Sequence, residues 1–246
     1  MYEYIDVHAH IGDASFDLDR DHVVGQAKNV IILEAGLEHQ SNVKALQLAD
    51  QYSNIRSCLG FHPEFAVKAS SFEVDMEIEF IRKYANRIVA ISEIGLDYKY
   101  GSRERQAAAF SKLMQLAAEL RLPVVLHSRW AAGAVLDASR GFDVKIDLHA
   151  FSGNMSEAKR AIDAGYFLSI GPNIVFNEYR QKLTSLIPLE NMLTETDSPV
   201  LGPKPRERNA PANIRLAVEK IAEIKGLTTE EVREVVYRNA RQVFAL

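Results

Sequence analysis

Two histidines separated by a single residue, His8 and His10, are the first side chains whose spacing suggests chemistry. In an extended strand, side chains at positions i and i+2 point to the same side, so both imidazoles could bind one divalent metal. The alternative is a pair of hydrogen-bonded strand histidines, because an isolated HxH motif is weak evidence. Asp6 falls on the same face in this pattern. It is either a carboxylate that orients His10 or approaches the metal, or a buried hydrogen-bonded acid.

Five of the seven histidines and two carboxylates fall where short apolar runs end, at His8, His10, His62, Glu93, His127, His149 and Asp197. If these runs are parallel strands of a barrel, their carboxyl ends form one rim, which carries the catalytic groups in such folds. Burying several imidazoles and carboxylates together is costly unless a cation pairs them. The pattern therefore favours a metal site over separate core histidines.

The ligand types limit the choice of metal. Nitrogen and oxygen ligands suit Zn²⁺, Mn²⁺, Mg²⁺, Co²⁺ or Ni²⁺, and the absence of thiolates from the set argues against iron–sulfur and blue-copper sites. The set is too large for one tetrahedral zinc that also keeps an open position. Two divalent ions about 3.5 to 4 Å apart, bridged by one carboxylate and a water, would use the whole set.

The elements that must position these side chains alternate between short β-branched runs and longer amphipathic stretches, which is typical of βαβ units and a parallel sheet. Eight strands are expected at residues 4–8, 30–34, 55–59, 88–92, 123–127, 144–149, 166–170 and 192–196. Helices are expected at residues 42–52, 72–86, 103–121, 156–163, 210–225 and 229–239. Thr228 and Glu231 have the spacing of a capping box at the start of the last helix.

Strand ends recur about every 27 residues between positions 8 and 197, close to the minimum length of a βα unit. No Pro- or Gly-rich linker, charge run or internal repeat divides the chain. We therefore expect an α/β fold with one (β/α)8 TIM barrel that spans residues 1–246 as a single domain. A doubly wound open sheet has the same alternation and is the alternative fold.

Composition excludes several classes of protein. The 246 residues are 47% hydrophobic and 25% charged, which is typical of a compact globular chain. A net charge of -4 gives no overall basic field for nucleic acid or anionic membranes, although a local basic patch or bound cations could still attract phosphate. No apolar run is long enough to span a bilayer, and the single Cys58 suits a reducing compartment. We expect a cytoplasmic protein with no membrane partner and no obligate protein partner.

Six ordered motifs resemble the TatD family of metal-dependent hydrolases, the TatD-type deoxyribonucleases among the amidohydrolase-like barrels. They are Asp6-Val-His8-Ala-His10, Gly60-Phe-His62-Pro63, Glu93-Ile-Gly-Leu-Asp97-Tyr98, Leu126-His127-Ser-Arg129, His149-Ala-Phe-Ser-Gly153 and Glu195-Thr-Asp197-Ser-Pro199. The resemblance extends from Ile5 to Phe244 and so covers nearly the whole chain. Ala150 departs from the pattern, because many relatives have Cys there, but this change leaves the ligand set intact.

The resemblance implies that His8 and His10 bind one metal and that His127 and His149 bind the other. It also implies that Glu93 bridges the two ions. Asp197 would bind the first ion or its water. The implied activity is a deoxyribonuclease, a 3′-to-5′ exonuclease that cleaves phosphodiester bonds of single-stranded DNA or 3′ ends through a metal-bridging hydroxide.

Three residues receive catalytic roles. We expect Asp197 to be the general base that takes the proton of the attacking water, and Glu93 to hold the ions. His62 is expected to donate to the substrate without binding metal. The alternative for His62 is a loop histidine braced by Pro63.

Four more residues are candidates for substrate binding. Arg129 could clamp a phosphate through two hydrogen bonds or form a surface salt bridge. Trp130, the single tryptophan, could stack on a base or pack at the start of a helix. Lys204 and Arg206 could attract phosphate from a flexible basic loop or simply be solvated. Residues 13–21, which contain four aspartates, are expected to form a solvated loop at the active site.

Two other functions stay open from the sequence. A bridged hydroxide also attacks carbonyl carbon, so the same ligand set could hydrolyse a small amide, ester or lactone. The non-enzyme alternative is a metal-stabilised interaction scaffold. The completeness of the ligand set argues against that scaffold.

Overall fold

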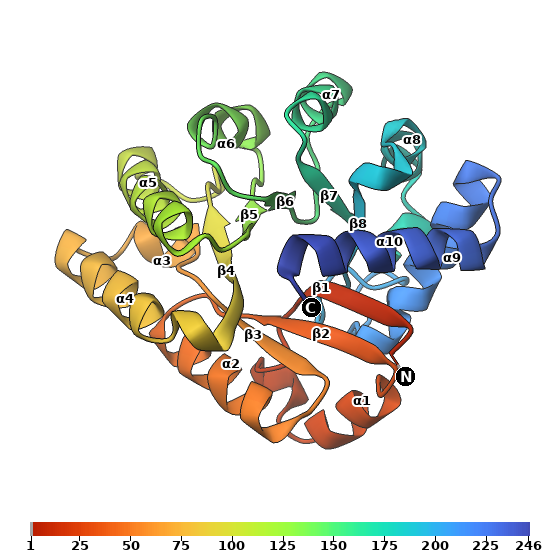
Figure 1. Cartoon of the computed structure of the whole chain (residues 1–246), viewed down its shortest axis with the longest axis horizontal. Helices are drawn as coiled ribbons and strands as arrows, with labels where there is room; N and C mark the ends of the chain where they lie inside the picture. Colours follow the sequence, from red (N-terminus) through yellow and green to blue (C-terminus); the bar gives the residue numbers. More distant parts are fainter. Residues whose placement is uncertain (1) are drawn as a thin grey trace.

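Eight strands form one parallel sheet in which each strand pairs with the next strand along the chain (Figure 1). The computed structural model describes residues 2–246, so Met1 of the expected span 1–246 lies outside the described residues. The strands are β1 (Tyr4–Ala9), β2 (Val30–Ala35), β3 (Ile55–Leu59), β4 (Ile88–Gly95), β5 (Val124–His127), β6 (Ile146–Leu148), β7 (Phe167–Ile170) and β8 (Met192–Thr194). All eight expected strands are present, and the ends of β6 and β8 are shorter than expected.

The sheet closes on itself through hydrogen bonds between β1 and the segment that follows β8. The backbone amide of Asp197 donates to the carbonyl of His8 over 2.8 Å, and the amide of His10 donates to the carbonyl of Ser198 over 2.8 Å. The expected (β/α)8 barrel is confirmed, and the open doubly wound sheet is wrong. The closure also places His8, His10 and Asp197 side by side.

Helices surround the sheet on its outer side (Figure 1). They are α1 (Arg20–Gln26), α2 (His39–Gln51), α3 (Pro63–Ala66), α4 (Ser71–Lys83), α5 (Arg103–Leu120), α6 (Ala132–Ala138), α7 (Met155–Asp163), α8 (Glu178–Leu186), α9 (Ile214–Lys225) and α10 (Thr229–Phe244). The sequence did not predict α1, α3, α6 and α8, because a helix of one or two turns is too short to show a 3.6-residue period. Among residues 2–246, no helix combines the length and the apolar composition that a membrane span requires.

Local capping sets the helix ends. The Glu38 side chain accepts hydrogen bonds from the amides of Gln40 and Ser41, so α2 begins at residue 39, earlier than expected. The expected capping box is present at α10, where Thr228 Oγ1 accepts from the Glu231 amide and the Glu231 carboxylate accepts from the Thr228 amide. Helix α10 runs on to Phe244, beyond the expected end at residue 239.

The end of α10 closes one end of the barrel. Ala240, Val243 and Phe244 pack with a cluster of inward-facing strand residues, namely Ile5, Val7, Ile31, Leu33, Cys58, Ala90, Val125 and Leu193. The α10 residues Arg233 and Gln242 contact Glu3 and Lys145, which precede β1 and β6. Helix α10 therefore covers the amino ends of the strands and leaves their carboxyl ends free.

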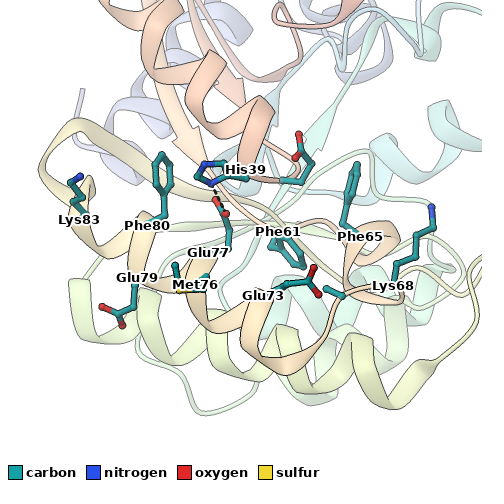
Figure 2. A pocket seen from close by; sticks show the side chains of 12 residues that line it. His39, Phe61, Phe65, Lys68, Glu73, Met76, Glu77, Glu79, Phe80 and Lys83 are labelled. Carbon is teal, nitrogen blue, oxygen red and sulfur yellow. Dashed lines mark hydrogen bonds and ion pairs between the residues drawn. The ribbon is translucent and has the colours of Figure 1, made fainter.

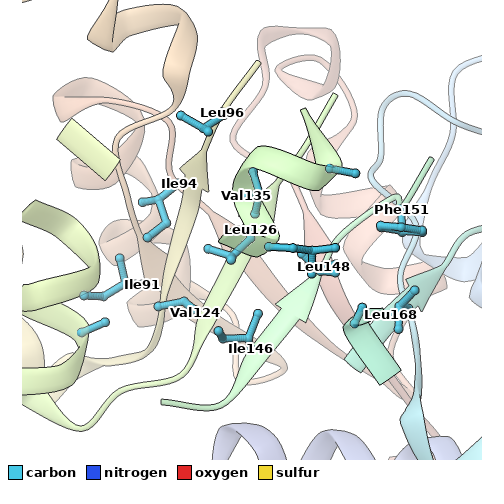
Figure 3. Close-up of a cluster of buried hydrophobic side chains, with 14 of the residues drawn as sticks. Ile91, Ile94, Leu96, Val124, Leu126, Val135, Ile146, Leu148, Phe151 and Leu168 are labelled. Carbon is cyan, nitrogen blue, oxygen red and sulfur yellow. The ribbon is translucent and has the colours of Figure 1, made fainter. Parts of the chain in front are cut away.

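A second apolar layer lies between the sheet and the helices. Figure 3 shows part of this layer, in which Val124, Leu126, Ile146 and Leu148 of β5 and β6 pack with Val135 of α6. Residues of β5 and β6 at the alternate positions face the barrel interior. His127 and, beyond the end of β6, His149 continue this alternation, so both histidines face the interior at its open end.

Strand β4 contains a bulge next to the expected bridging residue. The step from Ile91 to Ile94 on β4 opposes the shorter step from Val124 to Leu126 on β5. Ile91 and Ile94 both pack in the outer layer although they are three residues apart, which strict alternation does not allow (Figure 3). Such a bulge re-aims the side chains within it. Here it contains Glu93.

Strand β1 has the same irregularity. The step from Asp6 to Ala9 opposes the shorter step from Ile32 to Glu34 on β2. The shift lies around His8. It ends the alternation that would have placed Asp6 on the same face as both histidines.

Gly95 of β4 provides a direct test of how tightly β4 and β5 must approach. A Cβ atom on Gly95 would lie 2.1 Å from the carbonyl oxygen of His127, and the φ angle of Gly95 is +142°. Gly95→Ala is expected to lower the free energy of unfolding by about 2–4 kcal/mol, through backbone clash and strain. Gly25→Ala in α1 is the matched control, since nothing lies within 4 Å of its added Cβ. Urea denaturation measures both, and equal stability of the two variants would contradict the analysis.

Candidate metal centre

The carboxylate of Glu93 lies at the centre of the open end of the barrel and is almost fully buried. Its Oε1 atom is 2.5 Å from His127 Nδ1 and 2.9 Å from His149 Nε2. Its Oε2 atom is 3.5 Å from His8 Nε2 and 3.7 Å from His10 Nε2. One carboxylate therefore contacts two pairs of histidines through different oxygens.

Asp197 adds a second carboxylate on the side of His8 and His10. Its Oδ1 atom is 3.8 Å from His8 Nε2 and 3.5 Å from His10 Nε2. Its backbone has a φ angle of 52°, in the left-handed region that Asp adopts more readily than most residues. Strained backbone of this kind is often found at functional sites. The hydrogen bonds that close the barrel hold it in place.

The donor atoms fit divalent cations on both sides of Glu93. Bonds of 2.0–2.2 Å to nitrogen and oxygen place the ligand atoms of one ion roughly 3–4 Å apart. The separations on the His8 and His10 side fall in this range, and His127 Nδ1 lies 3.1 Å from His149 Nε2 on the other side. Within the described chain, Nε2 of His8 is buried without a hydrogen-bond partner. Such an atom is suited to bind a metal.

The electrostatics of the site also favour cations. Burial alone would raise the pKa of Glu93, but the charge of His149 and other imidazoles outweighs burial and holds this pKa well below its usual range. Burial alone would lower the pKa of His10, but the carboxylates of Asp197 and Glu93 raise it to about 9. The carboxylates are thus anionic and draw protons onto the histidines. A bound divalent cation would take the place of those protons.

Two histidines are held in fixed orientations by groups behind them. His10 Nδ1 lies 3.0 Å from the carbonyl oxygen of Ala35, so it donates and leaves Nε2 free to bind a metal. His127 Nε2 lies 3.0 Å from Asp97 Oδ2, so it donates and leaves Nδ1 facing Glu93.

Three buried carboxylates that received no role from the sequence support this centre. Asp97 holds His127, as described above. Glu34 accepts from the amides of Ile11 (2.5 Å) and Gly12 (2.8 Å) and so fixes the backbone after His10. Burial raises the pKa of Glu34 to about 7. Glu195 accepts from the Ala150 amide over 2.7 Å, beside the buried ring of the preceding histidine, His149.

A signal for Glu34 and Glu195 was present in the sequence. Each is a carboxylate at the end of an apolar strand run, and a buried carboxylate needs partners. What the sequence does not contain is the identity of those partners, since two of the three are backbone groups of Ile11 and Gly12.

Asp6 does not orient His10. Its carboxylate accepts from the backbone amide (2.8 Å) and hydroxyl (2.5 Å) of Thr196, and from the amide of His8. Burial raises the pKa of Asp6 well above its usual range. Of the two interpretations, the structure shows the buried hydrogen-bonded acid, because the bulge in β1 turns Asp6 away from the metal ligands.

His62 combines the two roles that the sequence left open. Its Nδ1 atom accepts from the Glu64 amide over 3.1 Å and caps α3. Nδ1 is therefore unprotonated, and the hydrogen of the neutral ring is on Nε2, which lies 3.7 Å from Glu93 Oε1. Burial lowers the pKa of His62 to about 4, so the ring is neutral near pH 7. It presents an N–H donor to the centre.

Arg129 does not form a surface salt bridge, and its usual clamping edge is not free. Nε and Nη2 donate to Asp97 Oδ2 over 2.9 and 2.5 Å, and Asp97 is fully buried. A bidentate phosphate clamp by this edge would require breaking the pair. Trp130 does not pack at a helix start. It is 74% exposed and precedes α6 by two residues.

Lys204 and Arg206 lie in the loop after β8. Together with Phe176 they line a cavity of about 480 Å³. Lys204 is mostly exposed, and its Nζ atom lies 3.4 Å from Glu207 Oε2. The cations of this loop are thus on the surface next to the segment that carries Asp197.

The expected solvated loop at residues 13–21 is wrong. Residues Ala14–Phe16 form a 3-10 helix with Phe16 buried, and α1 begins at Arg20. The aspartates are engaged in local contacts: Asp13 caps the 3-10 helix, Asp17 pairs with Arg20, Asp19 pairs with Arg208, and Asp21 bonds the Tyr52 hydroxyl. Each aspartate therefore has a structural partner.

A separate, largely apolar pocket of about 680 Å³ lies between α2, α3 and α4 (Figure 2). His39 Nδ1 lies 3.0 Å from Glu77 Oε2 at its wall, and Glu77 Oε1 accepts from Asn42 over 2.7 Å. Asn42 in turn bonds both the amide and the carbonyl of Gly60. This wall therefore fixes the end of β3, just before His62.

Comparison with known proteins agrees with the resemblance seen in the motifs. Residues 5–245 match the family model described as TatD related DNase. The chain is 37% identical over 244 residues to the uncharacterized metal-dependent hydrolase MJ1582 of Methanocaldococcus jannaschii, covering 98% of this chain and 97% of that protein. It is 38% identical over 258 residues to human deoxyribonuclease TATDN3, covering 98% and 94%.

Two further comparisons extend this result. The chain is 32% identical over 259 residues to the 3′-5′ ssDNA/RNA exonuclease TatD of Klebsiella pneumoniae, covering 98% of this chain and 97% of that protein. The crystal structure of YJJV, a TatD homologue from Escherichia coli k12, has the same fold, with a TM-score of 0.91 at 24% identity over 99% of this chain and 98% of that one. The chain belongs to the TatD family of metal-dependent hydrolases.

Proposed function

We propose that this chain is a divalent-metal-dependent deoxyribonuclease that removes nucleotides from the 3′ end of single-stranded DNA. The observation that carries the proposal is the Glu93 carboxylate, whose two oxygens face two separate pairs of histidines. The printed names of the human and Klebsiella relatives support the choice of a nucleic-acid substrate.

Two divalent ions would be held in this arrangement. His8, His10 and Asp197 would hold one ion with Glu93 Oε2, and His127 and His149 would hold the other with Glu93 Oε1. Their identity falls among Zn²⁺, Mn²⁺, Mg²⁺, Co²⁺ and Ni²⁺, since the donors are nitrogen and oxygen. When bound, such ions neutralise charge on a phosphoryl group and lower the pKa of water toward neutrality.

The protein side chains would carry the proton transfers. The pKa of Asp197 lies below its usual value, because burial is outweighed by the hydrogen bond from His10 and the nearby imidazoles, so the carboxylate is anionic and can accept a proton from the attacking water. As the new P–O bond forms, the bond from phosphorus to the 3′ oxygen breaks, and Asp197 returns the proton to that oxygen. His62 would donate from Nε2 to a phosphate oxygen.

The first prediction concerns Asp197 and the metals. Asp197→Asn is expected to lower the hydrolysis of 3′-end-labelled single-stranded DNA by at least about 100-fold, because the amide cannot accept the proton. Chelation is expected to stop the wild-type reaction, and Mg²⁺, Mn²⁺ or Zn²⁺, added in turn, to restore it. Asp143→Asn, an exposed acid before β6, is the matched control and should match the wild type.

The same assay separates the alternatives. Metal-dependent turnover of a lactone, ester or amide panel with the DNA left intact would favour the carbonyl hydrolase. No turnover of either substrate class, with every measured property unchanged in Glu93→Ala, would favour the scaffold.

The second prediction concerns the basic loop. Lys204 and Arg206 are expected to contact phosphates of the strand, so the double variant Lys204→Ala/Arg206→Ala should reduce the slope of log Kd against log salt concentration by about two units. The matched control is Arg87→Ala/Lys145→Ala, whose cations precede β4 and β6 at the opposite end of the barrel. Filter binding of a chelator-treated protein to single-stranded DNA measures both, and equal slopes would contradict the assignment.

The third prediction concerns Asp97, a positioning residue for His127. Burial would raise the pKa of Asp97, but hydrogen bonds from His127 and Arg129 hold it below its usual range. A carboxyl whose pKa is lower in the folded than in the unfolded state stabilises the fold above the unfolded value of about 3.9, and this contribution is lost as the pH falls through the folded value. Wild-type stability should therefore fall more steeply below about pH 4 than that of Asp97→Asn.

Urea denaturation between pH 2 and pH 7, in chelator, measures this difference. The affinity of Asp97→Asn for the second ion is expected to fall about 10- to 100-fold, as is typical when a partner of a ligating histidine is removed. Asp163→Asn, an exposed acid paired with Lys159, is the control. Identical pH profiles and ion affinities in wild type and Asp97→Asn would show that Asp97 does not position His127.

A further inference from the structure

A small cavity of about 350 Å³ lies at the rim of the barrel, between the loops that follow β5 and β6. Ser128 of its lining comes directly after His127, so their Cα atoms are about 3.8 Å apart. Gly153 and other residues of the loop after His149 form the opposite wall. The cavity therefore begins next to two of the candidate metal ligands.

Two aromatic side chains, Tyr98 and Trp130, line this cavity. The Tyr98 amide donates to the carbonyl of Arg129 over 3.0 Å, which ties the two lining loops together. Trp130 is 74% exposed and has a φ angle of 56°, in the left-handed region that is costly for a bulky residue. Neither packing nor backbone preference explains an indole in this position. Binding of a flat ligand would explain it, because aromatic faces stack on nucleobases.

The charges of the lining distinguish this cavity from the one at the basic loop. Its lining contains no lysine or arginine but includes the carboxylate of Glu157, which forms no ion pair within residues 2–246. A phosphate group would be repelled there, whereas a neutral base would not. The cavity lined by Lys204 and Arg206 has the opposite character and attracts phosphates.

We propose that the cavity of Tyr98 and Trp130 binds the base of the 3′-terminal nucleotide, while the remaining strand runs toward Lys204 and Arg206. This inference rests on the proposed nuclease function and names the subsite that reads the chain end. The cavity volume is at the lower end of the range for small-ligand pockets, which suits one nucleoside. A strand that continued past the base would place its next phosphate near Glu157. The subsite therefore selects an end over an internal position.

The single tryptophan makes base binding directly measurable without turnover. In the metal-loaded wild type, dAMP is expected to quench the fluorescence of Trp130 in a saturable way. The probe 2-deoxyribose 5-phosphate, which has the same phosphate and no base, should leave it unchanged. Equal quenching by both probes, or quenching by neither, would overturn the proposal.

Kinetics on DNA test the same contact. Trp130→Ala is expected to raise KM for a normal 3′ end about tenfold, the loss of one base-stacking contact. For the wild type, an abasic 3′-terminal nucleotide should raise KM by a similar factor. Trp130→Ala should then show no further loss on the abasic end. Phe72→Ala, another exposed aromatic on α4, is the matched control and should behave as wild type on both ends.

Glu157 is tested by substrates that differ in the charge at their end. A 3′-phosphorylated oligonucleotide should be cleaved more slowly than a 3′-hydroxyl one by the wild type. Glu157→Gln should reduce this difference several-fold. Glutamine can replace glutamate in the capping box that Glu157 forms with Asn154, so α7 is expected to keep its start. An unchanged difference would remove Glu157 from the selection of ends.

The outcomes separate the two proposals. If dAMP quenches Trp130 but DNA and mononucleotide release are absent with every metal, the nuclease function fails and the base subsite stands. If DNA is degraded from the 3′ end while normal and abasic ends have equal KM in wild type and Trp130→Ala, the nuclease function stands and the subsite is wrong.

Discussion

The structure depends on one buried anion, the carboxylate of Glu93, placed among imidazoles that come from β1, β5 and β6 and from the loop after β3. A carboxylate without charge partners in this position would be costly, so the ends of these elements must converge on it. An eight-stranded barrel provides this convergence, because all the carboxyl ends meet at one rim. The closure of β1 against the segment after β8 adds Asp197 to the same point.

Regular strands alone would not build this centre. The bulges in β1 and β4 lie around His8 and Glu93, and each changes the face to which the following side chains point. Behind the ligands, Asp97 and the carbonyl of Ala35 select which ring nitrogen of His127 and His10 faces inward. The apparent excess of buried acids in the barrel is thus a supporting layer. It lets the inner side chains keep their orientation without a bound ion.

Much of the fold followed from the sequence, because strand runs, helix stripes and the 27-residue spacing are local patterns, and the eight expected strands are present. The converging histidines were also visible, since residues at strand ends share one rim in any parallel barrel. Asp6 was misplaced because a bulge leaves no mark on the alternation of residue types. The role of Asp97 and the pairing of Asp19 with Arg208 join residues far apart in sequence, so they depend on tertiary contacts that no single segment contains. Trp130 was expected to pack because indoles usually do.

The distribution of charge explains how an acidic chain can be suited to a nucleic acid. The formal charge of -4 counts Glu93 and Asp197 as anions, although these carboxylates face imidazoles and a site suited to divalent cations. With ions bound, the centre would be positive while the rest of the surface stays acidic, so attraction is confined to the barrel mouth. On one side of that mouth Lys204 and Arg206 extend the positive region, and on the other side Glu157 ends it. A polyanion would then find favourable positions on only one side of the metals, which is the condition under which a chain end, rather than the middle of a strand, fits the site.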